Sequence, residues 1–579
     1  MKLYPEVEDY KVYYAQCLYK CGMYAEATRA AVSVDDNQFT HRMLKLEAYI
    51  KFDEEDYNTS TATLQQCLPD DPEVVVANAC VIFKEGKYEE ARLKFQEALN
   101  TLGYQADITY NIALCYYQLK QYGPSLKHIA EIIEHGIREH PELSVGSNSE
   151  GIEVRSVGNT QTLRETALIE AFNLKAAIEY QMKNMEAAKE ALSDMPPRSE
   201  EELDPVSLCN LALTSMEENP SDGFRKLNFL LSNNPCPPVT FGNLLLLYCK
   251  YEYYDLAADV LAENAHLTFK HLDGELYEFL EAVIMQQTSP AEAYRKFDEL
   301  SNKHIDYLRK LTKQVQDARL ARDNDGVKRA IKDYDDALER YIPVLMALAK
   351  IYWDREHYQM VEKIFRQSAE FCSEHDTWRL NVAHTFFMQE TKFKEAIRYY
   401  EPIVRKSLES ILDIPAIVLA NLCVSYIMTS QNEDAEELMR RIEKEQDRVM
   451  YQDPEKQIYH LCIVNLVIGT LYCSKGNYEF GISRIIKSLE PYHKKLSTDT
   501  WFYAKRCFLA LAETLAKHMI MLKDSTFVEI MTFLDAADAH GKKIPTVIDV
   551  AGQNTSEDLN TVSAEARLTK ELFLQLHDW

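Results

Sequence analysis

The sequence predicts an all-α protein in which about 12–14 helical hairpins stack into an α-solenoid. Two observations support this fold class. A pattern of aromatic, small and large apolar residues recurs along the chain, at intervals of 31 to 34 residues near its start. An apolar segment with helical periodicity precedes each copy, and short turns containing glycine or charged residues separate the segments. Because one hairpin cannot bury its apolar faces alone, neighbouring hairpins must stack.

Each copy has three landmarks: an aromatic residue in a polar turn, a small residue three positions later and a large apolar residue seven positions later. The first four copies are Tyr24/Ala27/Ala31, Tyr57/Ser60/Leu64, Tyr88/Ala91/Phe95 and Tyr122/Ser125/Ile129. Later copies are Met185/Ala188/Leu192, Tyr254/Ala257/Leu261, Tyr358/Val361/Phe365, Phe393/Ala396/Tyr400 and Tyr478/Gly481/Ile485. Weaker copies lie at Phe224, Ala293/Phe297 and Ala435/Met439.

The residue types follow from the packing of two antiparallel helices. A small side chain is needed where the helices cross, the turn aromatic covers the open end of the pair, and the large residue reaches the next hairpin. These spacings resemble the tetratricopeptide repeat, which implies a right-handed superhelix.

Interruptions of the repeat predict the domain organisation. We expect about four N-terminal hairpins in residues 1–140, an irregular loop in 141–165, central hairpins in 166–299, a charged and extended helical hairpin in 300–340, C-terminal hairpins in 341–545, and a polar loop with a capping helix in 546–579. The chain opens with the closing residues of a repeat whose earlier part is absent, so we expect one or more hairpins to be missing before it.

Two local expectations follow from the same interruptions. In the charged hairpin, Asp325 and Gly326 predict the turn between its helices. In the last helix, Leu568, Leu572 and Leu576 share one face, which predicts that this face covers the end of the array.

Composition excludes several classes of partner. The chain has 91 acidic and 64 basic residues, a net charge of −27. A field of this sign repels phosphate backbones and anionic lipid, so we expect no nucleic-acid partner. The sequence contains no run of about 18 uncharged apolar residues, so we expect no membrane insertion. The 13 cysteines include no C-x-x-C pair and predict reduced, buried thiols, notably Cys80, Cys115, Cys249, Cys423 and Cys462.

Catalytic signatures are absent from the sequence. It contains no dinucleotide or phosphate-binding glycine motif, no H-E-x-x-H and no G-x-S-x-G. Cys17 and Cys21 lie one helical turn apart, but no His or further Cys stands near them, so packing is favoured over a metal site. We expect no enzyme activity, no cofactor, no metal and no small-molecule substrate.

A repeat of this kind offers its concave surface for binding. The inward positions of each first helix are expected five, eight and twelve residues before the turn aromatic. The partner-binding residues predicted by this count are Val12, Tyr19, Val76, Phe83, Tyr110, Leu114, Tyr117, Tyr180, Leu246, Met346, Trp353, Met388, Val424, Ile427 and Leu466.

This set is unusually apolar, and three interpretations stay open. The helices could be misphased, the superhelix could be so tight that its groove packs on itself, or an apolar extended segment of another chain could complete the groove. Proline-rich segments suit the third interpretation because they lose little conformational entropy on docking.

Particular stretches resemble one family closely. They include "LKHIAEIIEHGIREHPEL", "DMPPRSEEELDPV", "FGNLLLLYCKYEYYDLAADVLAENAHLT" and "NLVIGTLYCSKGNYEFGISRIIKSLEPY". The sequence is similar to the tetratricopeptide subunit of intraflagellar transport complex B, the fleer type or intraflagellar transport protein 70.

The resemblance implies a structural subunit of trains that move along ciliary microtubules. It implies a cytoplasmic location in the cilium or flagellum and at the basal body, a role in cilium assembly, and a link to tubulin polyglutamylation. It also implies other complex B subunits as partners, above all intraflagellar transport protein 52, whose proline-rich central segment the superhelix would hold. The alternative is an adaptor of a chaperone or ubiquitin-ligase assembly, which would need a basic groove.

Overall fold

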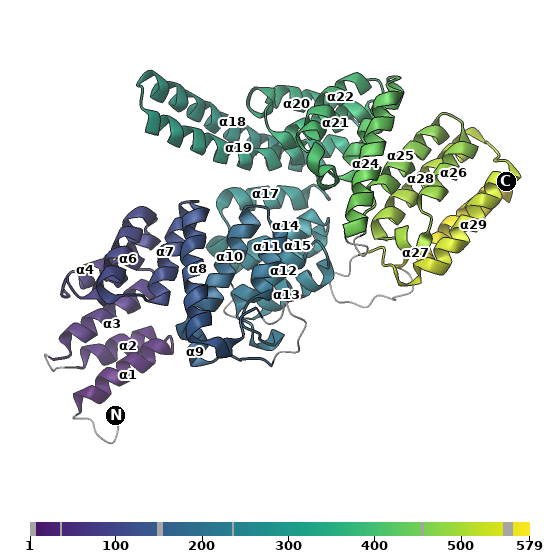
Figure 1. The fold of residues 1–579 in the computed structure, drawn as a ribbon. Coiled ribbons are helices and arrows are strands. Elements are labelled where there is room, and N and C mark those ends of the chain that lie inside the picture. The colour runs from purple at the N-terminus through teal and green to yellow at the C-terminus, as the bar shows by residue number, and fades with distance from the viewer. Residues whose placement is uncertain are drawn as a thin grey trace. The chain divides into compact units, whose positions relative to one another are not determined.

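The computed structural model describes residues 7–34, 38–146, 155–233, 237–452, 457–547 and 560–578. Within these ranges the regular structure is helical, apart from one isolated bridge between Pro545 and Thr561. Two compact units, Met1–Thr240 and Phe241–Trp579, divide the chain (Figure 1). The prediction of an all-α fold of tetratricopeptide-type hairpins is confirmed. In the part of the chain that the structure describes, no helix is both long and apolar enough to cross a bilayer.

The first unit consists of antiparallel helix pairs with short connections. Its pairs are α1 (Glu8–Lys20) with α2 (Tyr24–Val32), α3 (Thr40–Asp53) with α4 (Tyr57–Leu64), α5 (Pro72–Lys84) with α6 (Tyr88–Leu102), α7 (Ala106–Gln118) with α8 (Tyr122–Glu139), α10 (Leu168–Gln181) with α11 (Met185–Ser193), and α12 (Pro205–Ser215) with α13 (Pro220–Ser232).

The second unit continues the same architecture, and the division between the units falls inside α14. Its pairs are α14 (Pro238–Lys250) with α15 (Tyr254–Glu263), α17 (Gly274–Met285) with α18 (Pro290–Leu320), α19 (Asn324–Trp353) with α20 (Tyr358–Cys372), α21 (Asp376–Met388) with α22 (Phe393–Lys406), α23 (Ala416–Met428) with α24 (Asn432–Gln452), and α25 (His460–Ser474) with α26 (Tyr478–Ser488). Helices α28 (Thr498–His518) and α29 (Asp524–His540) follow and pack on α25 and α26 rather than mainly on each other. The shorter α16 (Ala265–His271) and α27 (Tyr492–Lys495) lie in connections, and α30 (Val562–Asp578) follows.

Most turns inside the hairpins share one closing geometry, although the described α12–α13 and α17–α18 turns contain no left-handed residue. A residue with left-handed backbone ends the first helix, as at Gly22 with φ 73°, and glycine adopts this conformation without the steric cost of a Cβ. The N–H of Met23 then donates to the carbonyl of Leu18 at 3.0 Å, which satisfies the helix end. The left-handed residues of the corresponding turns are Gly22, Glu55, Gly86, Lys120, Lys183, Glu252, Arg322, Glu356, Glu390, Ser430 and Gly476.

The small landmark residues lie buried where paired helices cross, as the repeat pattern predicts. Ser125 of α8 donates its hydroxyl to the carbonyl of Ala113 in α7 at 2.8 Å, so the two backbones approach closely. At Gly481, an added Cβ would lie 2.6 Å from the carbonyl oxygen of Gly469. Among the residues three positions after the first landmark of each copy, those that are at most 1% exposed are Ala27, Ser60, Ala91, Ser125, Ala188, Ala257, Val361 and Ala396.

Helices α18 and α19 form a hairpin whose turn differs from the expected one. The helices have 31 and 30 residues. The chain turns at 321–323, where Arg322 has φ 56°. Asp325 and Gly326 instead lie in the first turn of α19, because the Asp323 side chain accepts the N–H of Gly326 at 3.0 Å and caps that helix.

Helix α30 packs on α28 and α29 with part of the predicted face and with residues beside it. Val562, Ala566 and Phe573 are at most 1% exposed, whereas Leu568 is 65% exposed. The prediction is therefore wrong for Leu568, whereas Leu572 and Leu576 are partly buried and pack against the same cluster as predicted. The preceding polar loop lies outside the described residues from 548 to 559.

The irregular segment after α8 contacts the first unit at both its described ends. Leu143 in a short 3-10 turn (Pro141–Leu143) and Leu163 in α9 (Gln161–Glu165) are each 2% exposed and pack with Phe172. The N–H of Gly146 donates to Asp194 and the N–H of Val157 donates to Pro197, at 2.9 and 3.0 Å. Residues 147–154 of the predicted loop lie outside the described residues.

The cysteine prediction is confirmed in part. Cys115, Cys423 and Cys462 are buried, and Cys80 and Cys249 are only partly buried. Cys17 and Cys21, for which packing was expected, are exposed.

Candidate functional site

The candidate site is the row of first-helix side chains that the repeat register places inward. The left-handed turn residue sets this register, because its N–H bonds to the carbonyl three positions earlier, as from Gly22 to Tyr19 at 2.9 Å. The Tyr19 ring lies 6.1 Å from the ring of Tyr24, the turn aromatic. The same pairing recurs in Phe83–Tyr88 at 5.1 Å, Tyr117–Tyr122 at 6.0 Å and Trp353–Tyr358 at 5.1 Å. The turn aromatic therefore supports one face of each predicted ring.

The predicted residues differ in how much surface they expose. Val12, Val424 and Leu466 are at most 4% exposed and lie inside hydrophobic clusters, so their side chains offer no accessible surface in the chain by itself. Tyr180, Leu246 and Met388 are 45%, 40% and 38% exposed. The partly exposed ones are Tyr19, Val76, Phe83, Tyr110, Leu114, Tyr117, Met346, Trp353 and Ile427.

The count from the turn aromatic is one residue out of register before Phe393. There the left-handed residue, Glu390, stands three rather than two positions before the aromatic. Its N–H bonds to the carbonyl of Phe387 at 3.1 Å, and the Phe387 ring lies 5.8 Å from the Phe393 ring. Phe387 thus occupies the position that the sequence count assigned to Met388.

The second hairpin supplies two residues that the predicted set omitted. Counting five and eight positions back from Tyr57 gives Phe52 and Tyr49, so the signal was present in the sequence. The Phe52 and Tyr57 rings lie 5.7 Å apart in an edge-to-face arrangement. Phe52 and Tyr49 therefore belong to the same row as Tyr19 and Val76.

These residues line a cavity of about 560 Å³ in the first unit. Its walls combine the rings of Tyr19, Tyr49 and Phe52 with Val76, Val81 and Ile108. The cavity brings together side chains from α1, α3 and α5, which are consecutive first helices, together with the start of α7. Apolar walls of this size, with a few polar groups, are typical of a binding site.

The charged lining of this cavity is acidic. Asp53, Glu73 and Asp107 contribute carboxylates, and the described lining includes no lysine or arginine. Lys45 outside the lining pairs with Glu73 at 2.5 Å. Burial, together with hydrogen bonding to Asp53, raises the pKa of the Tyr19 hydroxyl, which therefore stays protonated and donates to that carboxylate.

In the second unit the predicted row includes one basic neighbour, Lys350 of α19. Its ammonium donates to Glu252 at 2.5 Å and lies 3.5 Å from the Tyr254 hydroxyl. Burial opposes the charge, but the bond to Glu252 outweighs it and raises the pKa of Lys350. The positive charge is thus compensated within the chain. Among the described residues, no group of three or more His, Cys, Asp or Glu could hold a metal ion.

Comparison with known proteins decides the family. Residues 240–579 match the model described as intraflagellar transport protein 70 C-terminal domain, and residues 2–162 match the model of intraflagellar transport protein 56. Intraflagellar transport protein 70A of Danio rerio is 63% identical over 583 residues, which cover 100% of this chain and 89% of that protein. The chain belongs to the intraflagellar transport protein 70 family.

Other members of the intraflagellar transport protein 70 family are similar to this chain over its whole length. The 70A protein of Xenopus tropicalis is 62% identical and the 70A1 protein of Mus musculus is 59% identical, each over 100% of this chain and 89% of the relative. This identity extends over both compact units. The chain is therefore an intraflagellar transport protein built of tetratricopeptide-type hairpins, and its family associates it with transport in cilia.

Solved structures show weaker similarity to this family member. The crystal structure of the APC/C hetero-tetramer Cut9-Hcn1 has a TM-score of 0.35 and 13% identity, covering 87% of this chain and 97% of that chain. A tetratricopeptide repeat protein from Parabacteroides merdae has a TM-score of 0.30 and 16% identity, covering 45% and 92%. No functional conclusion follows from superpositions with TM-scores this low.

Proposed function

We propose that this chain is a non-catalytic subunit of intraflagellar transport complex B whose first helices hold an extended, proline-rich segment of intraflagellar transport protein 52. The observation that carries the proposal is the cavity lined by Tyr19, Tyr49, Phe52 and Val76. Aromatic faces and aliphatic walls bind proline rings well, and an extended segment loses little entropy on docking. The Tyr49 hydroxyl can donate to a carbonyl of such a segment, whose backbone lacks internal hydrogen bonds.

The sign of the charge supports this partner over an acidic one. The cavity carries three carboxylates and no basic residue in its lining. An acidic tail of a chaperone would meet like charge there, which costs binding energy. Lys350, the basic residue near the row in the second unit, already pairs with Glu252.

The cellular role follows from the same proposal. As a complex B subunit the chain acts in cilium assembly and resides in the cilium or flagellum and at the basal body. Its effect on tubulin polyglutamylation arises through transport, because the sequence carries no nucleotide-binding motif of a ligase. Other complex B subunits contact it in addition to the proline-rich segment.

A binding experiment with a matched control tests the proposal. The purified full chain is titrated with the proline-rich segment, and the Val76→Glu variant is compared with Leu93→Glu. Val76 lines the cavity, whereas Leu93 is 56% exposed on α6 and does not line it. A buried extra carboxylate should weaken binding by about tenfold or more, and the control should bind like the unmodified chain. Equal affinities for both variants, with retained helicity, would overturn the proposal.

A further inference from the structure

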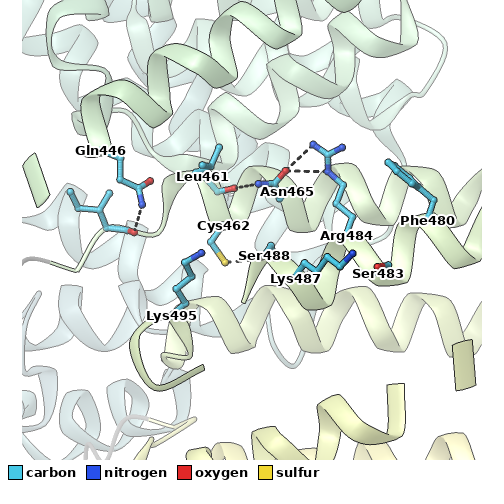
Figure 2. Close-up of a pocket in the computed structure, with 11 residues that line it drawn as sticks. Gln446, Leu461, Cys462, Asn465, Phe480, Ser483, Arg484, Lys487, Ser488 and Lys495 are labelled. Atoms are coloured by element: carbon cyan, nitrogen blue, oxygen red, sulfur yellow. Dashed lines mark hydrogen bonds between the residues drawn. The ribbon is translucent and has the colours of Figure 1, made fainter. Parts of the chain in front are cut away.

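A second cavity, of about 400 Å³, lies in the second unit among α24, α25 and α26. Figure 2 shows its lining side chains, with Arg484 beside Asn465 and Lys495 beside Cys462. No residue of the predicted inward row lines it. The cavity is therefore independent of the surface proposed for the proline-rich segment.

The charge of this cavity is opposite to that of the chain. Arg484, Lys487 and Lys495 line it, and none of the other described residues of its lining carries a carboxylate. Among the described residues, none of the three takes part in an ion pair. By comparison, Lys523, which directly precedes α29, pairs with Glu479 of α26 at 2.8 Å. Three uncompensated cations around one cavity stand out in a protein of net charge −27.

Asn465 holds the guanidinium of Arg484 in place. The amide oxygen of Asn465 accepts from Nε and Nη2 of Arg484 at 3.1 and 2.8 Å. The amide nitrogen of Asn465 donates to the carbonyl of Leu461 at 3.0 Å, which fixes the amide. Within the described part of the chain, Nη1 of Arg484 has no hydrogen-bond partner and stays available to a ligand. Burial lowers the pKa of Arg484, yet arginine remains charged at neutral pH.

The rest of the described lining is uncharged and mixes apolar side chains with amide and hydroxyl groups. Ile458 and Leu461 line the cavity, and the Phe480 ring is 48% exposed beside it. A small hydrated ion gains nothing from the apolar part of these walls, whereas a peptide that alternates acidic and apolar side chains can use both parts. Long polyanions and anionic membranes are disfavoured, because the field of the whole chain repels them.

We propose that this cavity binds a carboxylate side chain of an acidic partner peptide, with Arg484, Lys487 and Lys495 as counter-charges and Phe480 as an apolar contact. The guanidinium, oriented by Asn465, provides directional hydrogen bonds to the carboxylate. The two lysines supply non-directional attraction, since an ammonium acts as a point charge on a flexible stem. The site goes beyond the proposed function, because it needs no proline-rich segment.

The test uses the full chain and a short fluorescein-labelled peptide in which Glu alternates with Leu. Fluorescence anisotropy should show saturable binding, and a peptide with Gln in place of every Glu should bind at least about tenfold more weakly, as expected for lost charge-assisted hydrogen bonds. Binding should weaken as salt rises from about 50 to about 200 mM, because partly exposed charges are screened. Equal affinity for the two peptides would overturn the proposal.

Variants locate the binding. The triple variant Arg484→Gln, Lys487→Gln, Lys495→Gln should lose about tenfold or more in affinity. The matched control Lys363→Gln, Lys394→Gln, Arg398→Gln removes three exposed cations of the same unit that do not line the cavity, and it should bind normally. Because Arg484 is partly buried, its replacement could disturb the fold. The double variant Lys487→Gln, Lys495→Gln leaves Arg484 in place and should also bind the Glu peptide more weakly, with a thermal unfolding temperature like that of the unmodified chain.

Two results would contradict the assignment. An equal loss in the control triple variant would show that binding reflects general charge rather than this cavity. A phosphoserine peptide of the same spacing that binds more than about tenfold tighter than the Glu peptide would reassign the cavity to phosphate, whose oxygens make stronger charge-assisted bonds.

Discussion

Lys350 of α19 donates a hydrogen bond to Glu252, the left-handed residue of the turn between α14 and α15, at 2.5 Å and across 98 positions of sequence. The bond joins the turn of one hairpin to the first helix of another inside the second unit. Because Lys350 is one of the few basic residues at an inward position, its pairing removes a free cation from the predicted row. A contact between residues so far apart depends on how the hairpins stack.

The Lys350–Glu252 pair should contribute little to stability. The two side chains are 38% and 66% exposed, and exposed ion pairs contribute about 0.2–1 kcal/mol. A double-mutant cycle with Lys350→Gln and Glu252→Gln should give a coupling energy in this range from urea unfolding. A coupling above about 2 kcal/mol would contradict the prediction and indicate a dry environment around the pair.

Gly481 should not tolerate a methyl group. A Cβ there would lie 2.5 Å from the sulfur of Cys473 and 2.6 Å from the carbonyl oxygen of Gly469, so Gly481→Ala forces α25 and α26 apart. We expect a loss of about 1–3 kcal/mol in the free energy of unfolding. Gly123→Ala is the control, because nothing lies within 4 Å of its added Cβ and helical alanine is preferred over glycine. Similar losses in both variants would show that the close crossing is not the cause.

His384 should make stability fall in mild acid. Burial lowers the pKa of His384 to about 4 from 6.5 in the unfolded chain. The Tyr400 hydroxyl lies 2.6 Å and the Asn421 amide nitrogen 3.3 Å from its Nδ1, and the amide nitrogen can donate there only while Nδ1 carries no proton. The folded state therefore resists protonation, so its stability is full above pH 6.5 and declines as pH falls toward 4, by up to about 3 kcal/mol.

Comparison of two histidine variants isolates this effect. His384→Asn keeps an acceptor near Nδ1 but cannot titrate, so its unfolding free energy should fall less between pH 7 and pH 4.5 than that of the unmodified chain. His266→Asn replaces an exposed histidine of α16 and should leave the pH profile unchanged. Parallel profiles for the unmodified chain and His384→Asn would exclude His384 as the source.

Tyr49 should matter for binding more than for folding. It lines the first-unit cavity and is partly exposed, so Tyr49→Ala removes ring surface that a proline could contact. We expect weaker binding of the proline-rich segment by about fivefold or more, as is common when an interface aromatic is truncated. Tyr307→Ala, at a tyrosine that is 50% exposed on α18, is the control. If both variants bind the segment equally well, Tyr49 is not a contact.

The repeat pattern predicted the hairpins because its residues act locally. Small residues such as Ala27 are required wherever two helices cross, and a turn aromatic such as Tyr88 packs on a ring five positions earlier in the same hairpin. These contacts involve neighbours in sequence, so spacing alone reveals them. Counting five residues back from Phe393 gave Met388 instead of Phe387, because this turn contains one extra residue. Spacing measured from Phe393 alone cannot detect that extra residue.

By itself the sequence indicated the hairpins that follow the regular repeat, the small residues at their crossings and, apart from the helix before Phe393, the register of the predicted row. The tertiary structure decided how deep each member of that row lies. Leu466 is fully buried in a cluster with Trp501 of α28, whereas Leu246 is 40% exposed. Helical periodicity identifies a direction around one axis, but depth depends on how closely other hairpins approach. The acidic lining around Tyr19 and the cationic lining around Arg484 likewise arise from residues that only stacking brings together.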